Sequence, residues 1–300
     1  MKSRWWKGLI LGAFSLFALT GCSEKYPVLH PVGPVGEQEL FLIKFSTLLA
    51  AIVVIPVIAL LIFIVYRYRD KPDNQAPYQP EWSESKTLEF VWWAIPILII
   101  GILGAVTAKQ TFALTHPPKN SGEPLTIQVT SLDWKWVFMY PDQHIATVNY
   151  AEIPAGRPIQ FVLTADAPMN SFWVPALGGQ EYAMPGMAMR LWLQADKTGT
   201  FEGKGANFTG KGFAHMTFDV KSVNESDFNK WVADVKKSAP ALTKDGYKEL
   251  RKPSVMGKKS FSSYPKDLFM DTVMKNGGKY MNNHWMMMDQ QEKQMDHHDH

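Results

Sequence analysis

Two stretches of sequence decide the fold of this chain: FSTLLAAIVVIPVIALLIFIVY, from Phe45 to Tyr66, and FVWWAIPILIIGILGAVTA, from Phe90 to Ala108. Each runs for about 20 residues without a charged side chain, which is the length that a helix needs to span a bilayer. Pro56 and Pro96 lie inside them, and membrane helices tolerate proline where a helix in water would break. We therefore expect an antiparallel hairpin of two transmembrane α-helices within residues 40–115, rather than two buried helices of a soluble protein.

The connection between the two stretches, residues 67–88, is rich in positive charge and contains Arg67, Arg69, Lys71 and Lys86. Loops that carry an excess of lysine and arginine stay on the cytoplasmic side of a membrane. This loop is therefore predicted to be cytoplasmic. Residues 22–39 and everything after the second helix are then expected on the outer face.

The N-terminus has the pattern of a secretory signal. A basic, aromatic start from Met1 to Lys7 is followed by an apolar stretch from Leu9 to Leu19, and then by Thr20, Gly21 and Cys22. We expect residues 1–21 to be a signal peptide that is cleaved. The Leu-Thr-Gly-Cys box resembles that of bacterial lipoproteins, which implies lipid attachment at Cys22 and an anchored N-terminus. The alternative is an ordinary signal with an incidental cysteine.

Composition excludes several classes of function. The formal net charge is +3, and the signal segment holds three cations and no acid, so the remaining chain carries no net charge. A nucleic-acid-binding protein needs a surplus of lysine and arginine to neutralise phosphates. Cys22 is the single cysteine, which excludes a disulfide within the chain and a pair of thiolates on a metal.

Residues 120–221 have the pattern of an all-β domain. Short β-rich runs occur at Leu125–Thr130, Trp134–Tyr140, Ile159–Leu163 and Met187–Leu193. Proline and glycine turn signals separate them, at 140–142, 154–156 and 197–199. About 100 residues of this kind suit a β-sandwich. Its core is expected to contain most of the aromatic side chains, namely Trp134, Trp136, Phe138, Phe172, Trp173 and Trp192.

Four motifs, in order along the chain, carry a family resemblance. They are LEFVWWAIP at 88–96, WKW at 134–136, SFWVPALG at 171–178 and AMPG at 183–186. The chain from Cys22 to about Val220 resembles subunit II of the haem-copper respiratory oxidases. This resemblance implies two spanning helices followed by an extracytoplasmic cupredoxin-like sandwich, here with a C-terminal helical and extended extension.

The resemblance also implies a lost metal site. In the cytochrome c oxidases of this family, the sandwich binds two copper ions through His, Cys, Glu, Cys, His and Met. The corresponding positions here are Asn170, Gly205, Asn207, Thr209, Phe213 and Met216, so that only the methionine is retained. A lone thioether cannot hold a dinuclear copper site, and we expect no metal in this domain. His215 lies nearby, but one imidazole without partners favours a surface or core histidine.

A sandwich without these ligands is typical of the quinol oxidase branch, in which a lipid-soluble quinol reaches subunit I inside the membrane. The resemblance implies a terminal oxidase that couples quinol oxidation to oxygen reduction and proton translocation. Haem and copper are expected in subunit I, with no catalytic residue and no cofactor in this chain. Subunit I, small membrane subunits III and IV, and membrane lipid are the expected partners, without nucleic acid or cytochrome c. The expected location is the bacterial cell membrane.

Glu89 stands at the start of the second predicted helix and has two interpretations. The resemblance implies a proton uptake point for a channel that leads into subunit I. A carboxylate in the first turn is also favoured by the helix dipole alone, without any channel.

The C-terminal part falls into an appended region, residues 222–280, and a tail, residues 281–300. In the first, the spacing of Phe228, Trp231 and Val235 predicts a helix over Ser226–Lys237 that packs on the sandwich. From Lys244 onward we expect an extended arm on a partner surface, with aromatic side chains at Tyr247, Phe261, Tyr264 and Phe269.

The tail holds four histidines and five methionines: His284, His297, His298, His300, Met281, Met286, Met287, Met288 and Met295. Such residues bind soft metals, although a tract without regular spacing is typical of a flexible polar tail. A metal-binding tail would support an alternative function, a membrane-tethered copper-binding lipoprotein that supplies an oxidase. A cytochrome c oxidase subunit is opposed by the five absent ligands.

Overall fold

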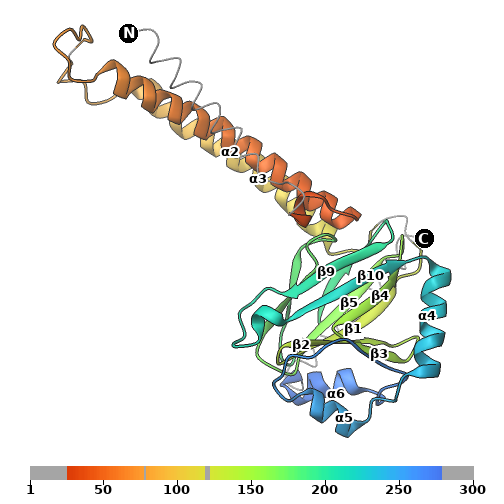
Figure 1. The fold of residues 1–300 in the computed structure, drawn as a ribbon. Helices are drawn as coiled ribbons and strands as arrows, with labels where there is room; N and C mark the ends of the chain where they lie inside the picture. The colour runs from red at the N-terminus through yellow and green to blue at the C-terminus, as the bar shows by residue number, and fades with distance from the viewer. Residues whose placement is uncertain (1–25, 78, 119–121, 279–300) are drawn as a thin grey trace, which may run out of the picture. The chain divides into compact units, whose positions relative to one another are not determined.

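The computed structural model describes residues 26–77, 79–118 and 122–278 (Figure 1). These residues form two compact units. One contains residues 38–116, and the other contains the described residues up to Glu37 together with those from Pro117 onward.

The helical unit contains the two predicted helices, α2 (Pro34–Arg67) and α3 (Lys86–Leu114). Both continue through their internal proline and are long and apolar enough to cross a membrane. The Ser85 hydroxyl accepts a hydrogen bond from the backbone N–H of Leu88 and caps the start of α3. The connection is therefore slightly shorter than the predicted loop of residues 67–88.

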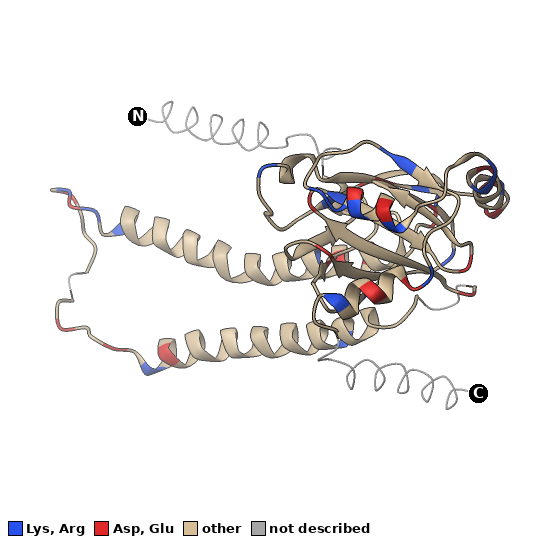
Figure 2. Cartoon of the chain, turned by 90° about the horizontal axis from the view of Figure 1, so that it is seen from below, with Lys and Arg blue, Asp and Glu red and all other residues tan. Residues whose placement is uncertain are grey.

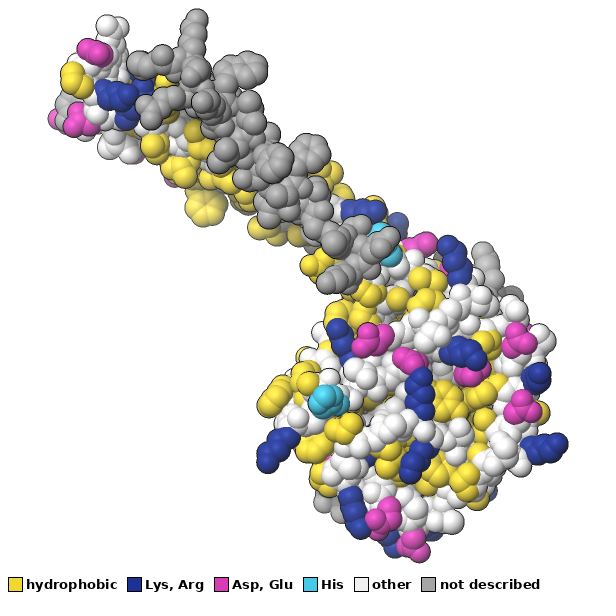
Figure 3. Space-filling view, in the orientation of Figure 1, with side chains coloured by type: hydrophobic (Ala, Val, Ile, Leu, Met, Phe, Trp, Pro, Cys, Tyr) yellow, Lys and Arg dark blue, Asp and Glu magenta, His cyan; other side chains and the backbone are white. Residues whose placement is uncertain are grey.

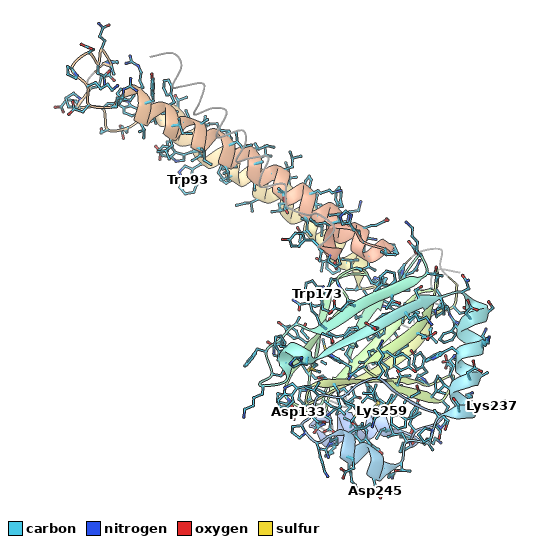
Figure 4. All side chains as sticks on the ribbon, in the orientation of Figure 1. Trp93, Asp133, Trp173, Lys237, Asp245 and Lys259 are labelled. Carbon is cyan, nitrogen blue, oxygen red and sulfur yellow. The ribbon has the colours of Figure 1, made fainter. Side chains whose placement is uncertain are left out.

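The surface of the hairpin is apolar. Where grey atoms do not hide the hairpin in Figure 3, its surface between the charged ends is mostly hydrophobic, and Trp93 projects outward in Figure 4 with an exposed fraction of 63%. Charged residues lie toward the ends of the helices (Figure 2). Leucines, isoleucines and aromatics exposed along two whole helices require an apolar solvent, which a bilayer supplies.

The second unit is a sandwich of two sheets, with strand orders β11-β3-β2-β1-β5-β8 and β4-β10-β9-β6-β7. Most neighbouring strands are antiparallel, but β1 pairs parallel with β5, and β4 pairs parallel with β10. The strands are β1 (Leu125–Leu132), β2 (Lys135–Tyr140), β3 (Ile145–Val148), β4 (Tyr150–Pro154), β5 (Ile159–Ala165), β6 (Asn170–Trp173), β7 (Gln180–Ala183), β8 (Met189–Leu193), β9 (Gly199–Gly205), β10 (Thr217–Val223) and β11 (Lys259–Phe261).

The core between the two sheets is aromatic, as predicted, but Trp134 and Trp173 are only partly buried. The ring of Phe172 on β6 lies 5.3 Å from that of Trp136 and 4.7 Å from that of Phe218, measured between centroids. Phe161 packs on the same ring at 5.2 Å. Buried aromatic rings in contact at these separations make a large contribution to the stability of a small sandwich.

The helix predicted over Ser226–Lys237 is confirmed as α4 (Glu225–Ser238). Its buried face presents Phe228, Val232 and Val235, and Trp231 packs edge-on against Tyr140 of β2 with centroids 5.5 Å apart. Since these residues recur at helical spacing, one face of α4 covers the sandwich.

The expectation of an extended arm on a partner surface is wrong for the described residues after Lys244. They form α5 (Lys244–Leu250), β11 and α6 (Leu268–Lys275), and β11 adds a strand to the larger sheet next to β3. The exposed fractions of Tyr247, Tyr264 and Phe269 are only 6%, 9% and 2%. The sandwich therefore extends beyond the predicted range of residues 120–221.

The physical reason is that β2 is apolar on both of its faces. Trp136 and Phe138 point into the core between the sheets, whereas Val137 and Met139 alternate with them and point to the opposite face. That opposite face is buried in a second cluster, which includes Leu250, Tyr247, Tyr264 and Phe269. The region thus folds on this chain's own sheet.

The N-terminal segment also belongs to this unit from Tyr26 to Glu37. Backbone N–H groups of Val32 and Gly36 donate to the carbonyls of Ala176 and Leu177 at 2.8 and 3.0 Å. A Cβ on Gly178 would lie 2.7 Å from a methyl carbon of Val35, so that only glycine allows this approach. The SFWVPALG motif therefore seats the segment that leads into α2.

Candidate functional site

The positions predicted to correspond to copper ligands converge in part. Asn170 begins β6, Gly205 ends β9 and Met216 directly precedes β10. The Asn170 Nδ2 donates a hydrogen bond to the Met216 Sδ at 2.9 Å, and its Oδ1 accepts one from the backbone N–H of Ser171 at 2.7 Å. Both side chains are 1% exposed. We call Asn170, Gly205 and Met216 the amide–thioether site.

Gly205 lies directly against Asn170. A Cβ at Gly205 would be 2.9 Å from the Asn170 Oδ1, so a cysteine in this place would collide with the amide. The backbone N–H of Gly205 donates to the Met216 carbonyl at 3.0 Å. The space at these three positions is therefore filled by the amide and its hydrogen bonds.

The other three positions make separate contacts along residues 206–216. The Asn207 side chain donates to the Met169 carbonyl at 3.1 Å, and the Phe213 ring packs on Phe208 with centroids 5.6 Å apart. Thr209 accepts a hydrogen bond at its carbonyl from the Trp134 indole, at 3.1 Å. These contacts hold the connection onto the sandwich.

The Trp134 side chain packs against the connection formed by residues 206–216. Its φ of 62° lies in the left-handed region, and its ring lies against Gly212 so closely that a Cβ there would be 2.3 Å from a ring atom. The assignment of Trp134 to packing agrees with these contacts.

The donors at this site do not fit a dinuclear copper centre. They comprise one amide and one thioether, whereas copper electron-transfer sites use thiolate and imidazole. Among the described residues, no group of three or more His, Cys, Asp or Glu side chains could hold a metal ion. His215 is exposed, at the end of a short 3-10 helix, Phe213–His215.

Glu89 lies in the first turn of α3 and is exposed. Its backbone N–H donates to the carbonyl of Ser85 at 2.9 Å, and its carboxylate sits directly before the uncharged stretch that starts at Phe90. An acid in the first turn interacts favourably with the helix dipole. The role of Glu89 as a proton uptake point stays a prediction. Cys22 and the His/Met-rich tail, residues 281–300, lie outside the described residues.

Lys135, the middle residue of the WKW motif, has a role that the sequence did not predict. Its ammonium group donates to the carbonyls of Asp133, Leu250 and Lys252 at 3.0, 2.9 and 2.9 Å, and the residue is 0% exposed. Burial lowers the pKa of Lys135, and the carboxylate of Asp133 raises it. Lys135 therefore joins β2 to the end of α5. The sequence feature that could have identified this role is a lysine within an otherwise apolar β-strand.

A second polar contact holds α6 and the end of α5. The buried carboxylate of Asp166, which directly follows β5, pairs with Arg251 at 2.6 Å and with Lys275 at 3.6 Å. The Asn276 amide donates to the same carboxylate at 3.0 Å. The appended region is thus fixed by charge as well as by apolar packing.

The chain is similar to several known proteins. A family model described as cytochrome c oxidase subunit II, periplasmic domain, matches residues 143–223. Quinol oxidase subunit 2 of Bacillus cereus is 45% identical over 267 residues, which cover 88% of this chain and 92% of that relative. Cytochrome bo(3) ubiquinol oxidase subunit 2 of Pseudomonas putida is 44% identical over 247 residues, which cover 82% of this chain and 78% of that relative.

Among solved structures, the periplasmic domain of subunit II of cytochrome oxidase from Bradyrhizobium japonicum is 29% identical. The superposition covers 41% of this chain and 98% of that chain, with a TM-score of 0.38.

Proposed function

Because this chain belongs to the family of quinol oxidase subunits 2, it is a subunit of a terminal quinol oxidase, and we propose that its outer domain serves assembly rather than electron transfer. The oxidase is a respiratory oxidoreductase complex whose catalytic centres lie in subunit I. The family's periplasmic domain and the two apolar helices make this chain a membrane protein with an outer-face domain.

The hydrogen bond between Asn170 and Met216 is the observation that carries the proposal. By the family resemblance, this contact would occupy the place where the copper-bearing branch needs soft ligands. An amide and a thioether do not supply the thiolate and imidazole donors that rapid one-electron transfer through copper uses. The electron donor is then one that bypasses the outer domain.

A quinol meets that requirement, because it is apolar and reaches subunit I from within the membrane. Two quinols give four electrons and four protons to one O2, which yields two quinones and two waters. Haem and copper in subunit I would carry these electrons. This chain would hold subunit I, together with the small subunits III and IV, in the membrane.

Two further features of the proposal concern the N-terminus and Glu89. Residues 1–21 would be removed and Cys22 would carry lipid, which anchors the N-terminus on the outer face of the bacterial cell membrane. An intact mass that lacks the first 21 residues and includes the acyl groups supports this part, and an unmodified Cys22 refutes it. Glu89 would take up protons from the cytoplasmic side.

Metal analysis of the purified chain, separated from its partner subunits, tests the copper-free outer domain. We expect copper well below one ion per chain after dialysis and no purple mixed-valence absorption. Two copper ions per chain, retained with that absorption, would overturn the proposal. A version that ends at Lys279 is the control, because it removes the histidines and methionines of the tail.

A further inference from the structure

Three cations lie at the end of α2 and in the residues that directly follow it. Arg67 directly follows the stretch from Phe45 to Tyr66, and Arg69 and Lys71 come next at alternate positions. At 1.5 Å per residue, a stretch of this length spans roughly 30 Å, which is the thickness of the bilayer's hydrocarbon core. Arg67 therefore stands at the depth where lipid phosphates lie.

These cations surround a pocket. It has a volume of about 420 Å³ and is lined by Tyr66, Arg67, Arg69, Lys71, Asp73, Asn74 and Gln75. All of these residues belong to the helical unit. A volume of this size accommodates a small polar group such as a phosphate with its glycerol.

The pocket is held open by contacts within the loop. The Arg69 guanidinium lies over the Tyr66 ring, 4.0 Å from its centroid. The Asn74 side chain donates to the Arg69 carbonyl at 2.8 Å, and the Asn74 backbone N–H donates to the Lys71 carbonyl at 3.0 Å. The loop thus turns back on itself and keeps its cations beside the helix end.

The positive charge of the pocket is not neutralised by paired acids. Asp73 also lines the pocket, so its lining carries three cations and one acid. No salt bridge joins a carboxylate to Arg67, Arg69 or Lys71 within residues 26–77, 79–118 and 122–278. Arginine presents a planar fork of donors that matches the oxygens of a phosphate. The pocket therefore offers donors to an anion at the membrane surface.

We propose that this pocket binds the phosphate headgroup of an anionic phospholipid. The position at the end of the apolar stretch favours a lipid over a soluble anion, since the acyl chains would then continue along the exposed apolar surface of α2. That the lipid belongs to the cytoplasmic leaflet rests on the orientation given under the proposed function.

Native mass spectrometry of the full chain in detergent tests the site. The protein is first delipidated and then titrated with phosphatidylglycerol or phosphatidylcholine. We expect tighter binding of phosphatidylglycerol, with a loss of about fivefold in affinity for each cation removed and a larger loss in the triple variant R67Q/R69Q/K71Q. The matched control is K44Q/K109Q, which removes two cations at the opposite ends of the same uncharged stretches and should bind as wild type does.

Three results would overturn the proposal. They are equal binding by the triple variant and the wild type, equal affinity for the two lipids, and displacement of phosphatidylglycerol by an equal concentration of inorganic phosphate. The third result would identify a soluble-anion site. Phosphatidylglycerol selectivity that is kept in the control, weakened in each single variant and lost in the triple variant supports the proposal.

The orientation is tested separately, so that its failure can be distinguished. The substitution Glu81→Cys introduces a cysteine in the same loop. In right-side-out vesicles, an impermeant thiol reagent should label this cysteine only after the vesicles are opened. Peptide mass spectrometry detects the label. Labelling from outside would overturn the cytoplasmic placement of the lipid, while lipid binding in detergent still reports on the pocket.

Discussion

The Asn170 side-chain amide and the Met216 sulfur, 46 residues apart in the chain, lie 2.9 Å from each other inside the sandwich. The amide donates to a thioether, a weak acceptor, and accepts a backbone hydrogen bond on its other side. Hydrogen bonds of this kind stabilise a fold by about 1 kcal/mol each, and a buried group that loses its partner costs more. The amide–thioether site therefore contributes to the stability of the outer domain.

The variant Asn170→Ala tests this contribution. It leaves the Ser171 N–H without its acceptor and opens a cavity against Gly205, so we expect a loss of about 2 kcal/mol in the free energy of unfolding. Thermal unfolding of the full chain in detergent, followed by near-UV circular dichroism, measures the change. The exposed Lys211→Ala serves as the control and should stay within about 0.5 kcal/mol of wild type. An Asn170→Ala protein as stable as this control would contradict the role of the amide.

Lys135 should hold the appended region on the sheet. In Lys135→Met the side-chain volume is kept, but the carbonyls of Leu250 and Lys252 lose their donor, and we expect a loss of about 2–4 kcal/mol. Limited proteolysis should then cut within residues 244–276 faster than in wild type. Lys259→Met on β11 removes an exposed lysine and should leave the cleavage rate unchanged. Equal cleavage of both variants would show that apolar packing alone fixes this region.

Alkaline pH should loosen the same region. Burial, with a smaller effect of Asp142, raises the pKa of Tyr264 to about 12, above the ordinary value of about 10. Between these values the unfolded chain releases a proton that the folded chain retains, so stability is complete below pH 10 and falls as pH rises toward 12. We expect the loss of stability from this group to begin above pH 10 and to grow toward pH 12.

Melting temperatures measured from pH 8 to pH 11 check this dependence. Tyr264→Phe should show a weaker alkaline decline than wild type, because the titrating hydroxyl is gone. Tyr182→Phe, at an exposed tyrosine, should decline as wild type does. Identical pH profiles for Tyr264→Phe and wild type would rule out this tyrosine as a source of the decline.

Glu89→Gln in the assembled oxidase tests proton uptake. Glutamine keeps the size of the side chain but carries no exchangeable acid, so oxygen reduction and proton uptake should slow severalfold, while Glu89→Asp should retain most of the rate. An oxygen electrode and a pH-indicator dye give the two rates. Wild-type rates in Glu89→Gln would contradict proton uptake by Glu89. The favourable interaction of its carboxylate with the start of α3 would then be its only role.

Much of the fold could be predicted from short-range patterns. The uncharged stretches identify α2 and α3 because their length matches a bilayer, and the spacing of Phe228 and Trp231 identifies α4 because one helical face carries them. The strands over Leu125–Leu132 and Ile159–Ala165 were also predicted within two residues at each end.

The fold of the appended region could not be predicted in the same way. The run from Lys135 to Tyr140 is apolar on both faces, but its covering residues come from more than 100 positions further along the chain, as in the contact of Lys135 with Leu250. No local sequence pattern identifies a contact with residues so far along the chain. Aromatic residues in a region without regular spacing are equally compatible with a surface on another subunit.

The candidate site was predicted only in part: the structure brings Asn170, Gly205 and Met216 together, whereas Asn207, Thr209 and Phe213 make separate contacts. Alignment on family motifs places Asn170 and Met216 together because the sandwich topology is retained, and the structure brings them into contact. The hydrogen bond between them depends on side-chain orientation, which the sequence does not carry.

Oxygen uptake by the purified oxidase that contains this chain tests the central claim most directly. The same preparation is supplied with a quinol or with reduced cytochrome c, at matched electron supply. An outer domain built around the contact of Asn170 with Met216 predicts uptake with quinol and none above background with cytochrome c. Cytochrome c oxidation at a rate comparable to that with quinol would contradict it.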